Sequence, residues 1–178
     1  MRYQLVMATD TTPSLRHGIL SDELQSERDQ LIEMLTKAYW MEVETVMSYL
    51  ANSINPEGVR AQEIIESLEE DIDEELGHAR QFGERIKELY GVVPGSLDFN
   101  AEQSYLQPPD DQIDVVHVIK GVIEAETGAI EHYNQIIEFC EGKDPVTQDM
   151  VTAILHDEEG HRRLFEGFLR EYKSEGMA

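Results

Sequence analysis

Apolar residues recur along most of this chain at intervals of three, four or seven positions, the spacing that places side chains on one face of an α-helix. After Ser21 they fall at Leu24, Leu31, Leu35, Ala38, Tyr39, Val46 and Leu50. The pattern predicts four helices, near residues 21–54, 56–90, 111–141 and 145–172. Residues 1–20 show no clear period, and we interpret them as an N-terminal arm in which Leu5, Val6, Met7, Leu15, Ile19 and Leu20 are the residues able to pack.

Prolines, glycines and short polar side chains mark the predicted helix ends. Asn55-Pro56 should stop the first helix, with Asn55 capping the second and Pro56 in its first turn. Gly91 offers a left-handed end to the second helix, and Pro94 prevents its resumption. Asp144-Pro145 repeats the cap-and-proline pattern before the fourth helix.

Connection lengths predict the topology. The first two helices are joined by a short turn, and so are the last two, through residues 142–144, so each pair should be antiparallel. About 20 residues separate the two pairs, from Gly91 to Asp110, which is long for a structureless loop. A crossover along the bundle explains this length. The expected fold is all-α: an arm over residues 1–20, then over residues 21–173 a four-helix bundle of two antiparallel hairpins joined by a long crossover.

The charge excludes one class of function. The 178 residues include 37 acids and 14 bases, a net charge of -23. Such a surface repels a phosphate backbone, so direct binding of nucleic acid is not expected. The acidity fits either a halophilic protein or a field that concentrates cations near a site. We favour the halophilic interpretation, because the charge is spread along the whole chain.

Cysteine content and hydropathy indicate the compartment. Cys140 is the single cysteine, so neither an internal disulfide nor a thiolate metal cluster is expected. Neither a secretory signal pattern nor an apolar stretch of membrane-spanning length is found. These features predict a soluble, cytoplasmic protein without a membrane partner.

Two helices carry the same short motif. Glu75 and His78 form a Glu-x-x-His, and so do Glu158 and His161. Residues three apart share a helix face, so each pair can present a carboxylate and an imidazole to one point. One such motif is weak evidence, because a chain of 178 residues with 6 histidines and 25 glutamates should contain about one by chance.

The repeat of a larger pattern strengthens the signal. Glu42 precedes Glu75, and Glu126 precedes Glu158, at nearly the same offset (33 and 32), and both lie within apolar surroundings. Two such halves would place four carboxylates and two imidazoles around one cavity. Burying the carboxylates alone would cost several kcal/mol each, whereas two divalent ions would neutralise them. Oxygen and imidazole ligands suit iron or manganese, and zinc would also bind but without redox chemistry.

The most specific stretch of the chain is Ile-Leu-His-Asp-Glu-Glu-Gly-His at residues 154–161, which is very similar to the fourth helix of bacterioferritins. Glu42 with Tyr49 seven residues later fits the first helix of that family. Over residues 22–172 the chain therefore resembles the ferritin-like superfamily, closest to its bacterioferritin and Dps-like branch. The resemblance implies six metal ligands: Glu42, Glu75, His78, Glu126, Glu158 and His161. It also implies that Glu75 and Glu158 bridge the two ions.

Two ligand positions have neighbouring rivals. Glu44 lies two residues from Glu42, hence about 200° around the helix, so only one of them can face the site; the Tyr49 spacing favours Glu42. Glu124 rivals Glu126 in the same way, and residues 128–130 fit the third helix of the family better with Glu126 as ligand. Tyr49 is the candidate catalytic residue, if it hydrogen-bonds a ligand; the alternative is a packing role.

The chain departs from bacterioferritins at two places. Leu76 stands where that family has its haem-ligating methionine, so haem is not expected. The segment after His161, residues 162–178, is too short to complete a fourth helix and add a full fifth one. A homo-oligomer is expected, but its size stays open between a dimer, a 12-mer and a 24-mer.

The resemblance implies a ferroxidase, in which two bound Fe(II) ions are oxidised by O₂ or H₂O₂, serving iron detoxification, iron storage or defence against oxidative stress. Two alternatives stay open. One is peroxide removal of the manganese catalase or rubrerythrin type, although no Cys-x-x-Cys motif is present to hold a rubredoxin-type electron donor. The other is metal binding or storage without catalysis.

Overall fold

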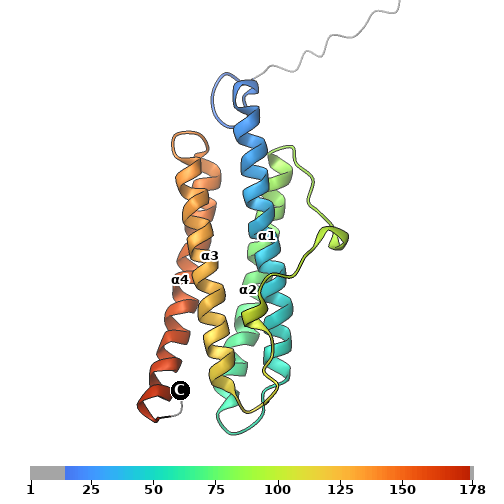
Figure 1. The fold of residues 1–178 in the computed structure, drawn as a ribbon. Helices are drawn as coiled ribbons and strands as arrows, with labels where there is room; N and C mark the ends of the chain where they lie inside the picture. The colour runs from blue at the N-terminus through green and yellow to red at the C-terminus, as the bar shows by residue number, and fades with distance from the viewer. Residues whose placement is uncertain (1–14, 177–178) are drawn as a thin grey trace, which may run out of the picture.

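Four long helices run side by side in the computed structural model, which describes residues 15–176. They are α1 (Gln25–Ile54), α2 (Ala61–Glu88), α3 (Val115–Cys140) and α4 (Pro145–Ser174). The α1–α2 and α3–α4 pairs are antiparallel hairpins, and the segment between them returns along the bundle beside α1 (Figure 1). The predicted all-α fold is therefore confirmed. In the described residues no helix is long and apolar enough to cross a membrane.

The crossover is attached to both hairpins. It contains two short 3₁₀ turns, η2 (Ser96–Asp98) and η3 (Ser104–Leu106), and a third turn, η1 (Asp22–Leu24), precedes α1. Asn52 of α1 donates a hydrogen bond of 2.8 Å to the Leu106 carbonyl. On α3, a Cβ at Gly121 would lie 2.6 Å from the Tyr105 carbonyl oxygen, so glycine allows the crossover backbone to approach this helix. These contacts fix the crossover against α1 and α3.

The predicted start of the second helix is wrong. Asn55 donates its N–H to the Ala51 carbonyl and so closes the last turn of α1, instead of capping α2. Glu57 then donates its N–H to the Gln112 carbonyl at 2.9 Å, and Gly58 has a φ of +100°. The chain after Pro56 is thus held beside the segment leading into α3, and α2 starts only at Ala61. The third helix likewise starts later than expected, at Val115.

The end of α2 also differs from the prediction. Tyr90, not Gly91, adopts the left-handed conformation, with a φ of 70°. Gly91 donates its N–H to the Ile86 carbonyl at 2.9 Å, which completes a Schellman-type end. A Cβ at Gly91 would lie 2.9 Å from the Ile86 side chain and 3.1 Å from that of Ile32. Glycine is therefore needed here for close packing rather than for its φ.

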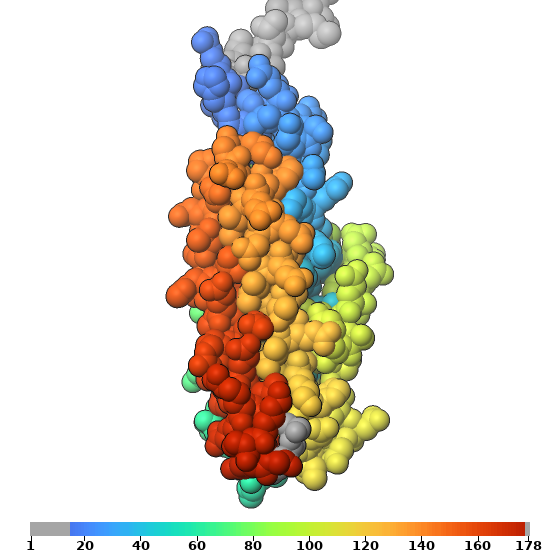
Figure 2. Space-filling view, turned by 60° about the vertical axis from the view of Figure 1, so that its left-hand side comes forward, coloured from blue at the N-terminus to red at the C-terminus, as the bar shows by residue number. Residues whose placement is uncertain are grey.

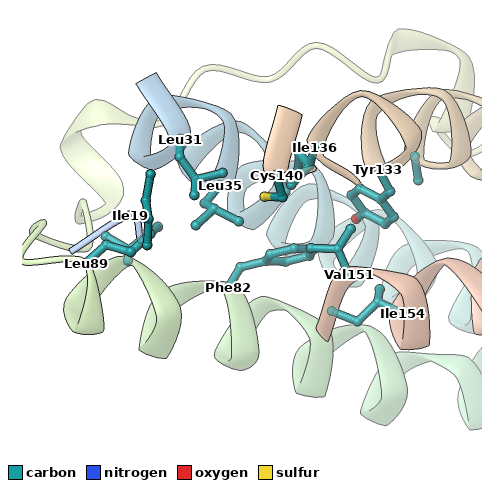
Figure 3. Packing of buried hydrophobic residues seen from close by; sticks show 13 residues of the cluster. Ile19, Leu31, Leu35, Phe82, Leu89, Tyr133, Ile136, Cys140, Val151 and Ile154 are labelled. Atoms are coloured by element: carbon teal, nitrogen blue, oxygen red, sulfur yellow. The ribbon is translucent and has the colours of Figure 1, made fainter. Parts of the chain in front are cut away.

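Part of the predicted arm packs on the bundle. Ile19 is buried, and its N–H donates to the Lys143 carbonyl at 3.1 Å. Its side chain lies close to Leu31 and Leu89 (Figure 3). Leu15 is exposed. Leu5, Val6 and Met7 lie outside the described residues, so the division into arm and bundle stays a prediction.

Two apolar clusters fill the bundle, one toward each end. The first, shown in Figure 3, consists of Ile19, Leu31, Leu35, Ala38, Phe82, Ile86, Leu89, Ala129, Tyr133, Ile136, Cys140, Val151 and Ile154. The second consists of Tyr49, Ala61, Ile64, Leu68, Leu106, Val115, Val118, Ile119, Val122, Ala125 and Phe165. Side chains of α3 and α4 meet along the length of one face (Figure 2). Between the clusters, every helix contributes charged residues at interior positions.

A buried ion pair joins α2 to the start of α4. Arg85 donates to both carboxylate oxygens of Asp144 at 2.9 Å and to the Thr147 hydroxyl at 2.7 Å. Asp144 also accepts the N–H groups of Val146 and Thr147, which confirms it as the cap predicted from the sequence. Burial alone would raise the pKa of Asp144, but the hydrogen bonds from Thr147 and Arg85 outweigh it and lower that pKa below its usual value of 3.8.

We expect Asp144→Asn to lower the free energy of unfolding by about 3 kcal/mol at pH 7, because it removes the buried partner of Arg85 and leaves that charge with only the exposed carboxylate of Glu88 beside it. The pKa of Asp144 is lower in the folded than in the unfolded chain. The stabilisation by this carboxylate is therefore complete at a pH above its pKa in the unfolded chain, and it is lost as the pH falls through its pKa in the folded chain. The difference between variant and wild type should therefore shrink below about pH 4. Urea unfolding at pH 7 and pH 3 measures this, with the exposed Asp149→Asn as control; a difference that grows in acid contradicts the assignment.

Candidate metal centre

The charged layer between the two clusters contains all six predicted ligands. Glu42 comes from α1 and Glu126 from α3, and the two Glu-x-x-His motifs come from α2 and α4. None of the six is more than 8% exposed. On each helix they take the place of apolar core residues: in α1, Glu42 lies between Ala38 of the first cluster and Tyr49 of the second.

The six residues form two overlapping groups of candidate ligands. The first consists of Glu42, Glu75, His78 and Glu158, and the second of Glu75, Glu126, Glu158 and His161. Within each group one ligand atom from every residue lies within 4.8 Å of the others. Glu75 and Glu158 belong to both groups, so the arrangement is that of two adjacent sites sharing two carboxylates.

The shared carboxylates direct one oxygen to each side. The Nδ1 atom of His78 lies 3.4 Å from Glu75 Oε2 and 3.2 Å from Glu158 Oε1. The Nδ1 atom of His161 lies 3.4 Å from Glu75 Oε1 and 3.5 Å from Glu158 Oε2. This geometry is what two bridging carboxylates need.

Several ligand atoms in this layer are buried without a hydrogen-bond partner among the described residues. They are Glu75 Oε1, both carboxylate oxygens of Glu158 and Nδ1 of His161. Buried polar atoms are nearly always paired. Here carboxylate oxygens and imidazole nitrogens converge instead, and this set of atoms fits divalent iron, manganese or zinc.

Protons balance the charge of these residues when no metal is bound. Burial, together with repulsion from Glu75 and Glu158, raises the pKa of both Glu42 and Glu126 well above the usual value. Burial would also raise the pKa of Glu75, but the neighbouring imidazole groups of His161 and His78 outweigh it and lower that pKa to about 2. The carboxylates in turn overcome the effect of burial on the histidines, raising the pKa of His78 to about 10 and that of His161 to about 12. The layer thus holds two neutral carboxyl groups and two imidazolium ions near neutral pH.

The neighbouring rivals of Glu42 and Glu126 point elsewhere. Glu124 is exposed. Glu44 is buried but binds the crossover: its carboxylate accepts the N–H of Glu102 at 2.9 Å and that of Gln103 at 2.7 Å. Neither rival belongs to the two ligand groups.

Glu44→Ala should therefore weaken the fold without changing the metal centre. The substitution leaves the N–H groups of Glu102 and Gln103 without their acceptor, which we expect to cost about 3 kcal/mol. Chemical denaturation measures the loss, and amide hydrogen exchange at residues 102 and 103 should become faster. Glu33→Ala, at an exposed position of the same helix, is the control. Unchanged exchange at both amides would contradict this role for Glu44.

Two tyrosines connect α1 and α3 across this layer, and each donates a hydrogen bond to the candidate ligand on the other helix. Tyr49 donates a hydrogen bond to Glu126, and Tyr133 donates one to Glu42. Both are fully buried, and burial together with the nearby carboxylates raises the pKa of each well above 10. Of the two roles considered from the sequence, Tyr49 thus has the first, because it hydrogen-bonds a candidate ligand. Tyr133 was missed, although it follows Glu126 by the same seven residues that separate Glu42 from Tyr49.

Comparison with known proteins identifies the family of this chain. Residues 7–174 match a family model described as the ferritin-like domain. The chain is 32% identical over 146 residues to the "DNA protection during starvation protein" of Pyrococcus furiosus, covering 79% of this chain and 77% of the relative. It is 25% identical over 153 residues to the bacterioferritin of Desulfovibrio desulfuricans, covering 85% and 81%. This chain belongs to the ferritin-like domain family.

Solved structures show the same bundle. The diiron bacterioferritin of Desulfovibrio desulfuricans superposes with a TM-score of 0.72 at 24% identity, covering 84% of each chain. The dodecameric thioferritin of Bacteroides fragilis superposes with a TM-score of 0.70 at 26% identity, covering 84% of this chain and 89% of that one. The predicted resemblance to the bacterioferritin and Dps-like branch is confirmed.

Proposed function

We propose that this protein is a cytoplasmic di-iron ferroxidase, which oxidises Fe(II) to Fe(III) with O₂ or H₂O₂ in iron detoxification or storage. The observation that carries the proposal is the pair of shared carboxylates, Glu75 and Glu158, each with one oxygen toward each histidine. Two Fe(II) ions bound to the same two carboxylates could each supply one electron to a single oxidant, and iron suits the oxygen and nitrogen ligands.

The residues have separate roles in this proposal. Glu75 and Glu158 would be shared by the two ions, Glu42 with His78 would hold one of them, and Glu126 with His161 would hold the other. Four carboxylates balance two divalent ions, so the buried layer stays neutral when loaded. Tyr49 and Tyr133 hold Glu126 and Glu42 in place through their hydroxyl groups. We propose that Tyr49 acts at the metal centre by orienting the carboxyl group of Glu126.

The charge of the chain bears on how it would act in the cell. The relative from Pyrococcus furiosus is named for DNA protection, but a net charge of -23 disfavours coating DNA directly. We therefore propose that any protection comes from removal of Fe(II) and its oxidant. Assembly into a homo-oligomer is part of the same proposal, and light scattering measures its size.

Stopped-flow absorbance after mixing metal-free protein with Fe(II), in air-saturated or peroxide-containing buffer, tests the proposed activity. We expect oxidation much faster than in buffer alone, and a fall of about 100-fold or more in Glu75→Ala, which loses a ligand of both ions. Glu124→Gln, at an exposed position of α3, is the control. Oxidation no faster than in buffer, or an unchanged rate in Glu75→Ala, would show that the protein is no ferroxidase. Metal analysis of the purified protein distinguishes iron from manganese and zinc.

A further inference from the structure

A side-chain hydrogen bond joins α3 to α4 one residue beyond a candidate ligand on each helix. Arg162 donates from Nε to the Thr127 hydroxyl at 2.9 Å. Thr127 follows Glu126, and Arg162 follows His161. These two ligands are the members of their group that the other ligand group does not share. We propose that Thr127 and Arg162 are positioning residues, which hold these two ligands aligned for one of the two ions, a role that rests on the metal binding proposed above.

Both partners of this bridge are fixed by a further contact. The Thr127 hydroxyl donates its proton to the Ile123 carbonyl at 2.6 Å, so its lone pairs are left to accept from Arg162. Arg162 Nη2 lies 3.0 Å from a carboxylate oxygen of Glu166, one turn further along α4. The guanidinium group is therefore held at two points, one on each helix.

The bridge acts at the level of the metal centre. Successive residues of a helix are only about 1.5 Å apart along its axis, so the bridge lies at the height of Glu126 and His161. The two helices are packed side by side along the face shown in Figure 2. Sliding or rotation of α3 against α4 would change the separation of the two ligands, and the bridge resists both movements. Ligands that are aligned before the ion arrives lose less freedom when they bind it, which favours a lower dissociation constant.

The other hairpin has different residues at the matching positions. Glu42 is followed by Val43, and His78 is followed by Ala79, and neither of these two side chains has a polar atom. Both line a cavity of about 450 Å³ between α1 and α2. This pair of positions cannot form the bridge. Loss of the bridge should therefore affect the ion held by the α3–α4 ligands and not the ion held by the α1–α2 ligands.

Zinc affinity in two ligand variants tests the proposal one ion at a time, without any redox step. Each variant removes a carboxylate that belongs to one ligand group only, so Glu42→Gln should keep the ion of the α3–α4 ligands and Glu126→Gln that of the α1–α2 ligands. In the Glu42→Gln background, Thr127→Val should raise the Zn(II) dissociation constant about 10-fold. In the Glu126→Gln background it should leave that constant unchanged. Competition with a chromophoric chelator measures both constants.

Three further variants separate the bridge from other effects of the substitution. Thr127→Ser keeps the hydroxyl and should retain the affinity. Thr152→Val is the matched control, because Thr152 also donates its hydroxyl to the carbonyl four residues earlier, that of Gln148, but at an exposed position. Arg162→Met should weaken the same ion as Thr127→Val, and it serves if Thr127→Val fails to fold. The two together should weaken the ion no more than either alone, because both remove one hydrogen bond.

An equal loss of zinc affinity in both backgrounds, or no loss in the Glu42→Gln background, would overturn the proposal, because a general loss of stability would affect both ions alike. Urea unfolding measures the stability of each variant separately. A Glu42→Gln variant that does not bind one tight ion would overturn the ligand assignment and this role with it. Failure of the ferroxidase proposal looks different, since the selective effect on zinc would persist while Fe(II) oxidation was not accelerated.

Discussion

Replacing Glu126 by glutamine is expected to reduce the number of tightly bound divalent ions from two to one, whereas Glu75→Gln should abolish tight binding of both. The reason lies in how the two ligand groups overlap: Glu126 belongs to one group only, and Glu75 belongs to both. Glu42→Gln should resemble Glu126→Gln, because Glu42 belongs only to the other group. The number of ions lost thus depends on whether the replaced carboxylate belongs to one ligand group or to both.

Glutamine suits this experiment because it has the shape of a protonated glutamate. Burial raises the pKa of Glu42 and Glu126, so both are neutral in the metal-free protein, and the exchange should leave its fold intact. Competition for Zn(II) with a chromophoric chelator counts the tightly bound ions, and circular dichroism checks the fold. Glu44→Gln and Glu124→Gln are the controls, and each should retain two. Two tight ions in Glu75→Gln, or one in Glu124→Gln, would show that the ligands are assigned wrongly.

Loading the metal-free protein with two divalent ions at pH 7 is expected to release about four protons. Two come from His78 and His161, because the pKa of each is raised to about 10 and about 12 and each must free its Nδ1 atom to bind. The other two come from Glu42 and Glu126, which hold their protons because burial and the neighbouring carboxylates raise their pKa. Since protons compete with the metal for these atoms, metal affinity should fall as the pH is lowered.

Calorimetric titration with Zn(II) in buffers of different ionisation enthalpy measures the number of protons released. Glu126→Gln is the internal check: it should bind one tight ion and release about two protons, one each from Glu42 and His78. A wild-type release of two protons or fewer would mean that at least two of these four groups are already deprotonated in the metal-free protein. The assignment of the protons to Glu42, Glu126, His78 and His161 would then be wrong.

Much of the fold could be predicted from the sequence because the signals are local. Helical periodicity depends on residues three and four apart, and Asp144-Pro145 at the start of α4 is a cap whose hydrogen bonds reach only two and three residues ahead. The duplicated spacing of Glu42 and Glu126 from their motifs identified the six residues that the structure brings together. That they bind metal stays a prediction until ions are counted.

Other features could not be predicted, because they depend on contacts between distant segments. Asn55-Pro56 has the local signature of a helix start, yet the bond from Glu57 to the Gln112 carbonyl holds that segment outside α2. The spacing to Tyr49 favoured Glu42 over Glu44 as a ligand, but the role of Glu44 itself depends on the crossover 58 residues further on. Tyr133 is different, because extending the seven-residue spacing to the second half of the chain would have predicted it.

The sequence by itself determined that four helices form, which face of each is buried, and which six residues carry charge into that face. These properties follow from the periodicity of side chains along a helix. The tertiary structure decided which carboxylate binds the crossover and which oxygen of Glu75 and Glu158 faces each histidine. Those outcomes depend on how helices distant in sequence are aligned along the bundle, and no local spacing encodes that alignment.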